Sequence, residues 1–221
     1  MPNNCVKKDI DSSFLEENVK RFFEVGIKDL THEVFYASDI SSCNRRILYK
    51  VIGSDNDSKE DIKQKFHRKY IVKKWANIFS NINLITIVGS EVVVADNYHN
   101  LTDTLDFVIK INDVYAIVMV QERDEKSYSK GVARKHVVHA NAQLWLSELQ
   151  NCFIVYEGKD SKNFSIYHIS PSQAIVDFIK EKCVLLNQIK LSGNLPDRKY
   201  LKANEDECVF CEFRKRCWDL T

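Results

Sequence analysis

The segment Leu101-Thr-Asp-Thr-Leu-Asp-Phe-Val-Ile-Lys-Ile111 decides the fold class, because its apolar residues alternate along one face of a predicted strand. A polar turn, Asn112-Asp113, separates it from the branched run Val114 to Gln121, and the run Glu91 to Ala95 precedes it. Short branched runs between polar turns predict an antiparallel meander of three strands. Asp106 places a carboxylate inside the central strand, where burial is costly unless a cation, a hydrogen-bond donor or a metal meets it. Alternatively, Asp106 forms hydrogen bonds within a turn or at a cap.

Helical patterns flank the meander on both sides. Helices are predicted over Phe14–Val25, Ser41–Val51, Lys59–Phe79, Val132–Leu149 and Pro171–Leu186. Two further strands are predicted at Phe153–Tyr156 and Phe164–Ile169. This order of elements predicts an α/β (α+β) protein that ends in a cysteine-rich tail.

Length and composition describe one globular domain spanning residues 1–221. One hydrophobic core still suffices at 221 residues. With 44% hydrophobic and 29% charged residues, and only six Gly and three Pro, the chain is neither collagen-like, low-complexity nor disordered. No apolar run approaches the roughly 20 residues of a membrane helix, and no secretory leader is visible, so we expect a cytoplasmic protein without a membrane partner.

The net charge of +1, from 32 basic and 31 acidic residues, does not predict a nucleic-acid partner. The distribution of the basic residues along the chain does predict one. Two runs are rich in cations: Lys59, Lys63, Lys65, Arg68, Lys69, Lys73 and Lys74 in the first, and Arg123, Lys126, Lys130, Arg134 and Lys135 in the second. Each run alone is equally well explained as a solvated helix face. Together they predict a local positive surface.

The cysteines carry the most specific signal in the sequence. Seven are present, and Cys208, Cys211 and Cys217 form a C-x2-C-x5-C hook near the end of the chain. Together with the distant Cys43 they make a four-sulfur site, whose asymmetric spacing favours a [4Fe–4S] cluster over zinc or over unrelated buried thiols. Cys152 and Cys183 lie in apolar patterns and are predicted to be small buried hydrophobes.

Residues that could bind a metal, a cluster or a substrate occur in a definite order along the chain. They are Ser38-x4-Cys43-x-Arg45-x3-Tyr49, His67, Asp106, Gln143 and Cys208-x2-Cys211-x-Phe213-x3-Cys217. This series, which spans most of the chain, resembles the RecB-like CRISPR-associated exonuclease family of the PD-(D/E)XK nuclease superfamily. The resemblance implies a mixed sheet flanked by helices, and an iron–sulfur tail in which Cys43 and the C-terminal hook meet at the N-terminal helical region. It also implies a DNA substrate, single-stranded or at ends, and protein partners in DNA processing.

The same resemblance implies that His67 and Asp106 hold a divalent metal, Mg or Mn, together with the glutamate of a Glu-x-Lys motif. Met119 and Gln121 occupy those two positions here. A methionine offers a hard cation only a soft thioether, so one metal ligand is missing. Gln121 keeps a polar tip that can orient water, and Gln143 matches the family's helix glutamine. The predicted catalytic set is therefore His67, Asp106, Gln121 and Gln143.

Three hypotheses follow, and the sequence leaves open whether the protein is an enzyme. The first is a DNA-binding module with a degenerate metal site. The second is an active exonuclease that uses a relocated carboxylate, from Glu91, Asp103 or Glu122, of which Glu122 needs a strand bulge to reach the site. The third is a zinc-stabilised protein-interaction domain. The predicted phosphate contacts are Arg68, Lys69, Lys73, Arg134 and Lys135.

Overall fold

The computed structural model describes residues 34–52, 59–123, 131–158 and 163–218. All of them lie in one compact unit, His32–Thr221. The predicted helix Phe14–Val25 lies outside the described residues, as do Cys5 and the side chains of Lys59, Lys63, Lys65, Lys126 and Lys130.

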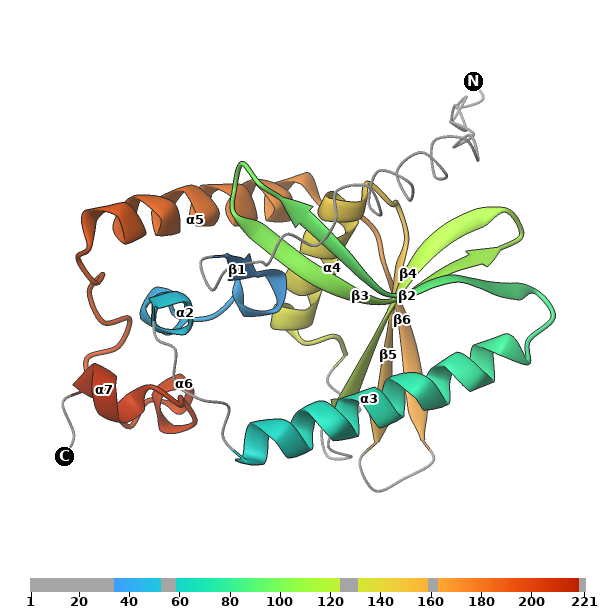
Figure 1. The fold of residues 1–221 in the computed structure, drawn as a ribbon, viewed down its shortest axis with the longest axis horizontal. Helices are drawn as coiled ribbons and strands as arrows, with labels where there is room; N and C mark the ends of the chain where they lie inside the picture. The colour runs from blue at the N-terminus through green and yellow to red at the C-terminus, as the bar shows by residue number, and fades with distance from the viewer. Residues whose placement is uncertain (1–33, 53–58, 124–130, 159–162, 219–221) are drawn as a thin grey trace. The chain divides into compact units, whose positions relative to one another are not determined.

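A six-stranded mixed sheet forms the centre of this unit (Figure 1). β2 (Ile85–Asp96), β3 (Leu101–Ile111) and β4 (Val114–Arg123) are antiparallel neighbours, which confirms the predicted meander. β5 (Cys152–Gly158) runs parallel to β4, and β6 (Phe164–Ile169) closes the sheet as an antiparallel edge. The predicted first strand of the meander was too short, because the alternating pattern begins at Ile85 rather than at Glu91.

The strand pairing along one edge of β3 is interrupted, and the candidate site lies at this interruption. Its other edge pairs with β2 from end to end. At the gapped edge, the short strand β1 (Phe35–Tyr36) pairs with residues 101–102, and β4 pairs with residues 107–111. Residues 103–106 have no strand partner at this edge, so their polar groups are available to side chains.

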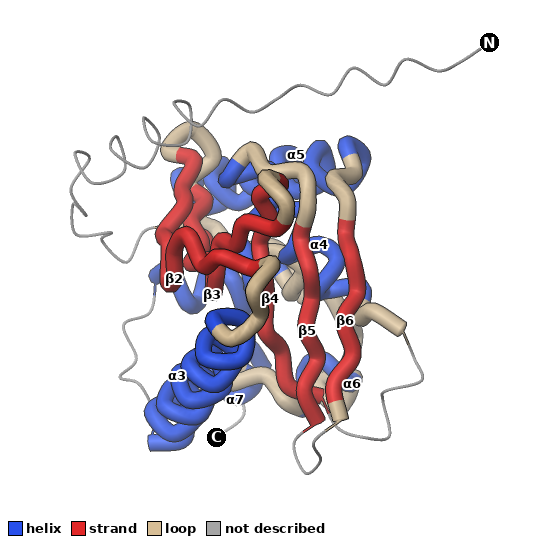
Figure 2. Tube along the Cα trace, turned by 90° about the vertical axis from the view of Figure 1, so that its right-hand side faces the viewer, coloured by secondary structure: helices blue, strands red, loops and turns tan. Residues whose placement is uncertain are grey.

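Helices cover both faces of the sheet (Figure 2). α3 (Lys59–Ser80) packs Ile71, Trp75 and Phe79 against β3 and β4. α4 (Arg134–Ser147) and α5 (Gln173–Ser192) lie on the other face with α2 (Asn44–Ile52) and the short helix η1 (Ala37–Asp39). The mixed, helix-flanked α/β fold is thus confirmed. Among the helices that the structure describes, none is long and apolar enough to cross a membrane.

α5 is longer than the apolar pattern predicts. Its fully buried residues end at Leu186, and Ile189 is partly buried against the same core. The helix continues to Ser192 and stops at Gly193, whose φ of 69° is left-handed. A glycine adopts this conformation without the steric cost of a Cβ atom. The buried face therefore ends before the helix does.

The C-terminal tail packs on α2, as expected. Its short helices α6 (Asp206–Val209) and α7 (Arg214–Trp218) lie beside that helix (Figure 1). Phe213 contacts the ring of Tyr49 with 5.4 Å between centroids, and Arg46 pairs with Glu212 at 3.1 Å. The tail and α2 are thus joined by an aromatic contact and an ion pair across more than half of the chain.

Candidate functional site

A pocket of about 530 Å³ opens beside the unpaired stretch of β3. Asp103, Thr104 and Asp106 contribute that stretch to its wall. The other polar residues that line it are Tyr36, Ser38, Arg68, Lys69, Glu91, Gln121, Lys135, His136 and His139. Such a volume suits a ligand the size of a nucleotide.

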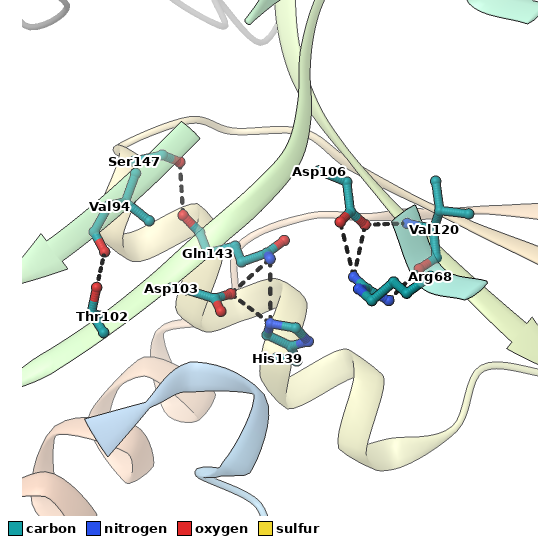
Figure 3. A network of polar contacts seen from close by, with 9 residues as sticks. All are labelled: Arg68, Val94, Thr102, Asp103, Asp106, Val120, His139, Gln143 and Ser147. Atoms are coloured by element: carbon teal, nitrogen blue, oxygen red, sulfur yellow. Dashed lines mark hydrogen bonds and ion pairs between the residues drawn. The ribbon is translucent and has the colours of Figure 1, made fainter. Parts of the chain in front are cut away.

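Asp106 fills the gap between β3 and β4 together with Arg68. The Asp106 carboxylate, 6% exposed, accepts hydrogen bonds from the Val120 backbone N–H at 2.8 Å and from Arg68 Nη2 at 2.9 and 3.1 Å (Figure 3). Arg68 Nη1 donates to the Val120 carbonyl at 3.1 Å. Burial raises the pKa of Asp106, and the Arg68 charge and the Val120 N–H act in the opposite direction. The Asp106 carboxylate, which was expected to bind a metal, is therefore bound to the Arg68 guanidinium.

His67, the other expected metal ligand, has a different partner. His67 Nε2 lies 2.7 Å from Glu122 Oε1. Glu122 follows Val118 and Val120 on the face of β4 that packs against α3, and β4 pairs with β5 in continuous register through Arg123. No bulge turns Glu122 towards Asp106, so the structure does not bring His67, Asp106 and Glu122 together.

The residues of this site do not fit a divalent metal. A hard cation requires oxygen ligands. Both Asp106 oxygens bind Arg68, and Met119 is fully buried and supplies a thioether. Within the described ranges, no three His, Cys, Asp or Glu side chains are grouped so that they could hold a metal ion. Gln121 does line the pocket, as predicted for the position of the family lysine.

Glu91 reaches the pocket through an irregular part of β2. The register with β3 shifts between Ile87 and Gly89, and Glu91 has a left-handed φ of 51°. A Cβ atom at position 89 would lie 2.7 Å from Val92 Cγ2, so a larger residue would have to displace that side chain. Ser90 pairs with Phe107 and Val92 with Leu105, so Glu91 stands across from Asp106. Strained backbone of this kind is frequent at functional sites.

A second network, centred on Asp103, was not predicted. His139 Nε2 lies 2.5 Å from Asp103 Oδ2, and Gln143 Nε2 donates to the same oxygen at 2.7 Å (Figure 3). Their exposed fractions are 7% for Asp103, 8% for His139 and 1% for Gln143. Gln143 thus lies in the interior, but with Asp103 rather than with Asp106. The i, i+4 spacing of His139 and Gln143 was the signal available in the sequence.

Ser147, one helical turn after Gln143 on α4, extends this network. Its hydroxyl donates to the Gln143 carbonyl at 2.7 Å. It therefore contacts the backbone of α4 and leaves the Gln143 side chain to Asp103.

His136 lies one helical turn before His139. Its Nδ1 is 2.6 Å from the Tyr156 hydroxyl, which accepts the Ala133 N–H at 3.3 Å. Burial first, and then the Lys135 cation, lower the pKa of His136 to about 4. His136 is therefore neutral at pH 7.

The predicted phosphate contacts divide into two groups. Arg68, Lys69 and Lys135 line the pocket. Lys73 and Arg134 are exposed and do not line it. Because the Arg68 charge is shared with Asp106, the exposed ammonium groups of Lys69 and Lys135 are the main cations for an incoming anion.

The four predicted cluster ligands lie near α2 and the tail, partly exposed and without disulfides. Arg45 Nη1 is 3.7 Å from Cys217 Sγ, and the Arg46 charge acts on Cys211. Lys182 donates to the Ser42 carbonyl at 2.6 Å, next to Cys43. Thiols are the donor type that an iron–sulfur cluster requires, but in the part of the chain that the structure describes these four are not grouped closely enough to hold a metal ion.

The two remaining described cysteines are structural. Cys152 and Cys183 are fully buried, which confirms the prediction. Burial raises the pKa of each thiol to about 12, so neither is a thiolate at neutral pH.

No family model and no curated protein matches this sequence. Among solved structures, a protein designated SSO0001 is 15% identical with a TM-score of 0.59, over 96% of this chain and 98% of its own. An alkaline exonuclease from Laribacter hongkongensis, LHK-Exo, is 9% identical with a TM-score of 0.55, over 79% and 93%. A phage-related exonuclease from Haemophilus somnus is 12% identical with a TM-score of 0.53, over 76% and 100%.

The fold is PD-(D/E)XK-like. At these identities the likeness concerns the arrangement of the backbone. In this protein with a PD-(D/E)XK-like fold, the unpaired stretch of β3 lines the pocket through Asp103, Thr104 and Asp106.

Proposed function

We propose that this PD-(D/E)XK-like protein binds DNA with little or no metal-dependent cleavage, because protein ion pairs have replaced its metal site. The observation that carries the proposal is the Arg68 guanidinium bound to both oxygens of Asp106. An arginine is permanently charged and cannot generate a metal-bound hydroxide. It supplies fixed positive charge beside a phosphate without supplying a nucleophile.

DNA is the proposed ligand on two grounds. Exonucleases share the fold, and LHK-Exo has also been solved in complex with dAMP. In this chain, the pocket carries Lys69 and Lys135 beside a volume that suits a nucleotide. The absence of a helix-turn-helix or zinc-finger pattern favours contacts to the phosphate backbone of single strands or ends over base readout.

We further propose that Cys43, Cys208, Cys211 and Cys217 hold a [4Fe–4S] cluster. Supporting evidence is the placement of three cations, Arg45, Arg46 and Lys182, around thiols whose cluster carries net negative charge. The described cysteines form no disulfide, which supports a reducing, cytosolic location.

The decisive experiment measures DNA binding and DNA cleavage in the same samples. Labelled single-stranded DNA is titrated with the protein in EDTA, and cleavage is then followed with magnesium or manganese. Binding in EDTA without cleavage in either metal is expected. The double variant Lys69→Met with Lys135→Met should lose most of the binding, whereas the exposed Lys202→Met serves as the matched control.

Robust cleavage that is lost in Asp106→Ala or Glu122→Ala would favour the active exonuclease with a relocated carboxylate. Absence of DNA binding at low salt would favour a protein-interaction domain, with protein partners then to be sought.

The cluster has its own test, made on protein purified without oxygen. Iron and visible absorbance are expected, and Cys211→Ser should lose both, whereas the buried Cys183→Ala should retain them. The mutant should also melt at a lower temperature, since a cross-link across a long loop stabilises a fold by several kcal/mol in theory, about 3 to 5. Zinc in place of iron would overturn the cluster proposal.

A further inference from the structure

The Asp103–His139 pair has the arrangement of a general base. Asp103 Oδ2 accepts a hydrogen bond from His139 Nε2, and the Gln143 amide N–H donates to the same carboxylate oxygen. The tautomer that pairs with this carboxylate carries its proton on Nε2, which also lies 3.3 Å from Gln143 Nε2, and the lone pair of the neutral ring is then on Nδ1. A buried carboxylate that fixes the tautomer of a histidine in this way also stabilises the imidazolium formed when Nδ1 takes a proton.

His139 shares its pocket with two cations. His139 lines the pocket together with Lys69 and Lys135. Neither lysine has an anionic partner among the described residues, whereas Lys74, on the same helix as Lys69, and Lys110 on β3 do. His136, also in the lining, is held neutral beside them. His139 and two cations that lack an ion-pair partner among the described residues thus line one cavity, in which Arg68 is bound to both oxygens of Asp106.

We propose that this pocket cleaves RNA by metal-independent transesterification, with His139 as the general base and with Asp103 and Gln143 as its positioning residues. The inference rests on the metal-free site of the proposed function, but not on DNA being bound there.

The step balances without any further reactant. His139 Nδ1 takes the proton of a ribose 2′-hydroxyl, and the 2′-oxygen forms a bond to the adjacent phosphorus. The bond from phosphorus to the 5′-oxygen breaks, and that oxygen takes a proton from the Lys135 ammonium. The products are a 2′,3′-cyclic phosphate and a 5′-hydroxyl. Proton exchange with water returns His139 and Lys135 to their starting states.

RNA is favoured over DNA by the source of the nucleophile. Hydrolysis of DNA needs an activated water, which a nuclease of this fold would obtain from its metal. The 2′-hydroxyl of RNA is already attached beside the phosphorus, so the attack is intramolecular and needs only deprotonation and charge stabilisation. Lys69 and Arg68 supply the positive charge beside the phosphate.

The first test changes the substrate and leaves the protein intact. A labelled single-stranded RNA is incubated with wild-type protein in excess EDTA, beside the same oligomer carrying one 2′-deoxy nucleotide at the main cleavage position. Cleavage of the first to a 2′,3′-cyclic phosphate, with loss of at least 100-fold in rate at the deoxy position, is expected. Failure to cleave RNA, or cleavage only when magnesium is added, would overturn the proposal.

The second test changes the protein. His139→Gln should reduce the EDTA-resistant rate by at least 100-fold, the range of a lost general base. The exposed His168→Gln on β6 should retain the wild-type rate. Asp103→Asn should lower kcat with KM for RNA nearly unchanged, because it affects the tautomer and not the cationic contacts. Activity that survives His139→Gln would overturn the assignment, and melting curves identify a variant that has failed to fold.

The two proposals fail separately. DNA binding in EDTA is measured on the same preparation, so a protein that binds DNA but leaves RNA intact retains the proposed function and loses this inference. A protein that cleaves RNA without binding DNA does the reverse.

Discussion

Asp103 and Asp106 stand three residues apart on the unpaired stretch of β3, and each takes its partner from a different helix. Asp106 binds Arg68 of α3 and the Val120 backbone, whereas Asp103 binds His139 and Gln143 of α4. A guanidinium keeps its proton at every physiological pH, but an imidazole can exchange one. The Asp106 end is therefore a fixed connection between two strands, and the Asp103 end is the part that can carry chemistry.

The largest expected effect would convert the Asp106 end into a metal site. The double change Met119→Glu with Gln121→Lys restores the family motif, but Arg68 still occupies Asp106. Adding Arg68→Ala removes the guanidinium from both Asp106 oxygens, and only the Val120 N–H still donates to Oδ2. We expect the triple variant to cleave single-stranded DNA with magnesium at least 100-fold faster than the wild type, and at least tenfold faster than the double variant.

Adding Asp106→Ala to the triple variant should abolish this gain. Equal cleavage by the double and triple variants would show that Arg68 does not block the site.

The next effect concerns stability. Asp106→Ala leaves a partly buried guanidinium and the Val120 N–H without their acceptor, so the free energy of unfolding should fall by about 3 kcal/mol. Replacing both partners, Arg68→Met with Asp106→Leu, should cost less, because no charge is left unpaired. Urea unfolding measures both. Equal losses in the two proteins would contradict the view of this pair as a structural connection.

The pH dependence of stability tests the α4 side of the pocket. His136 has a folded pKa of about 4 against 6.5 when free, so the unfolded chain binds the extra proton between these values. Stability should fall as the pH drops from about 6.5 to about 4, by roughly 2 kcal/mol after allowance for partial exposure. His136→Gln should show a shallower decline. Thermal melts across this range compare the two proteins, and parallel curves would exclude the histidine as the cause.

The smallest expected effect is on the salt dependence of DNA binding, which compares the cation beside Asp106 with the cation beside the α4 histidines. Lys69 follows Arg68, and Lys135 precedes the histidines of α4. Replacing either by methionine should reduce the slope of log affinity against log salt by roughly 0.7 for single-stranded DNA. An unchanged slope for one of them would show which end of the pocket lies away from the phosphate backbone.

The sequence predicted the elements well because their periodicities are local. The meander, the long helix α3, β6 and the buried character of Cys152 follow from alternation or helical spacing over short windows. The difference at Met119 and Gln121 from the Glu-x-Lys motif of the family that the sequence resembles is likewise visible in a short window. Among the residues singled out from the sequence, Asp106, Gln121 and three of the five cations line the pocket. His139 was not singled out, because its partner Asp103 lies 36 residues away and only the packing of α4 on β3 brings them together.

By itself, the sequence determined the strand and helix pattern, the spacing of the thiols and the presence of Met119 and Gln121 in the third strand of the meander, since each is a property of residue type at short separation. Only the tertiary structure decided that β1 and β4 leave residues 103–106 of β3 unpaired. It also decided that α3 turns His67 to Glu122 and Arg68 to Asp106. These choices depend on where helices cross the sheet and on the cost of leaving a buried carboxylate without a partner, which no local pattern encodes.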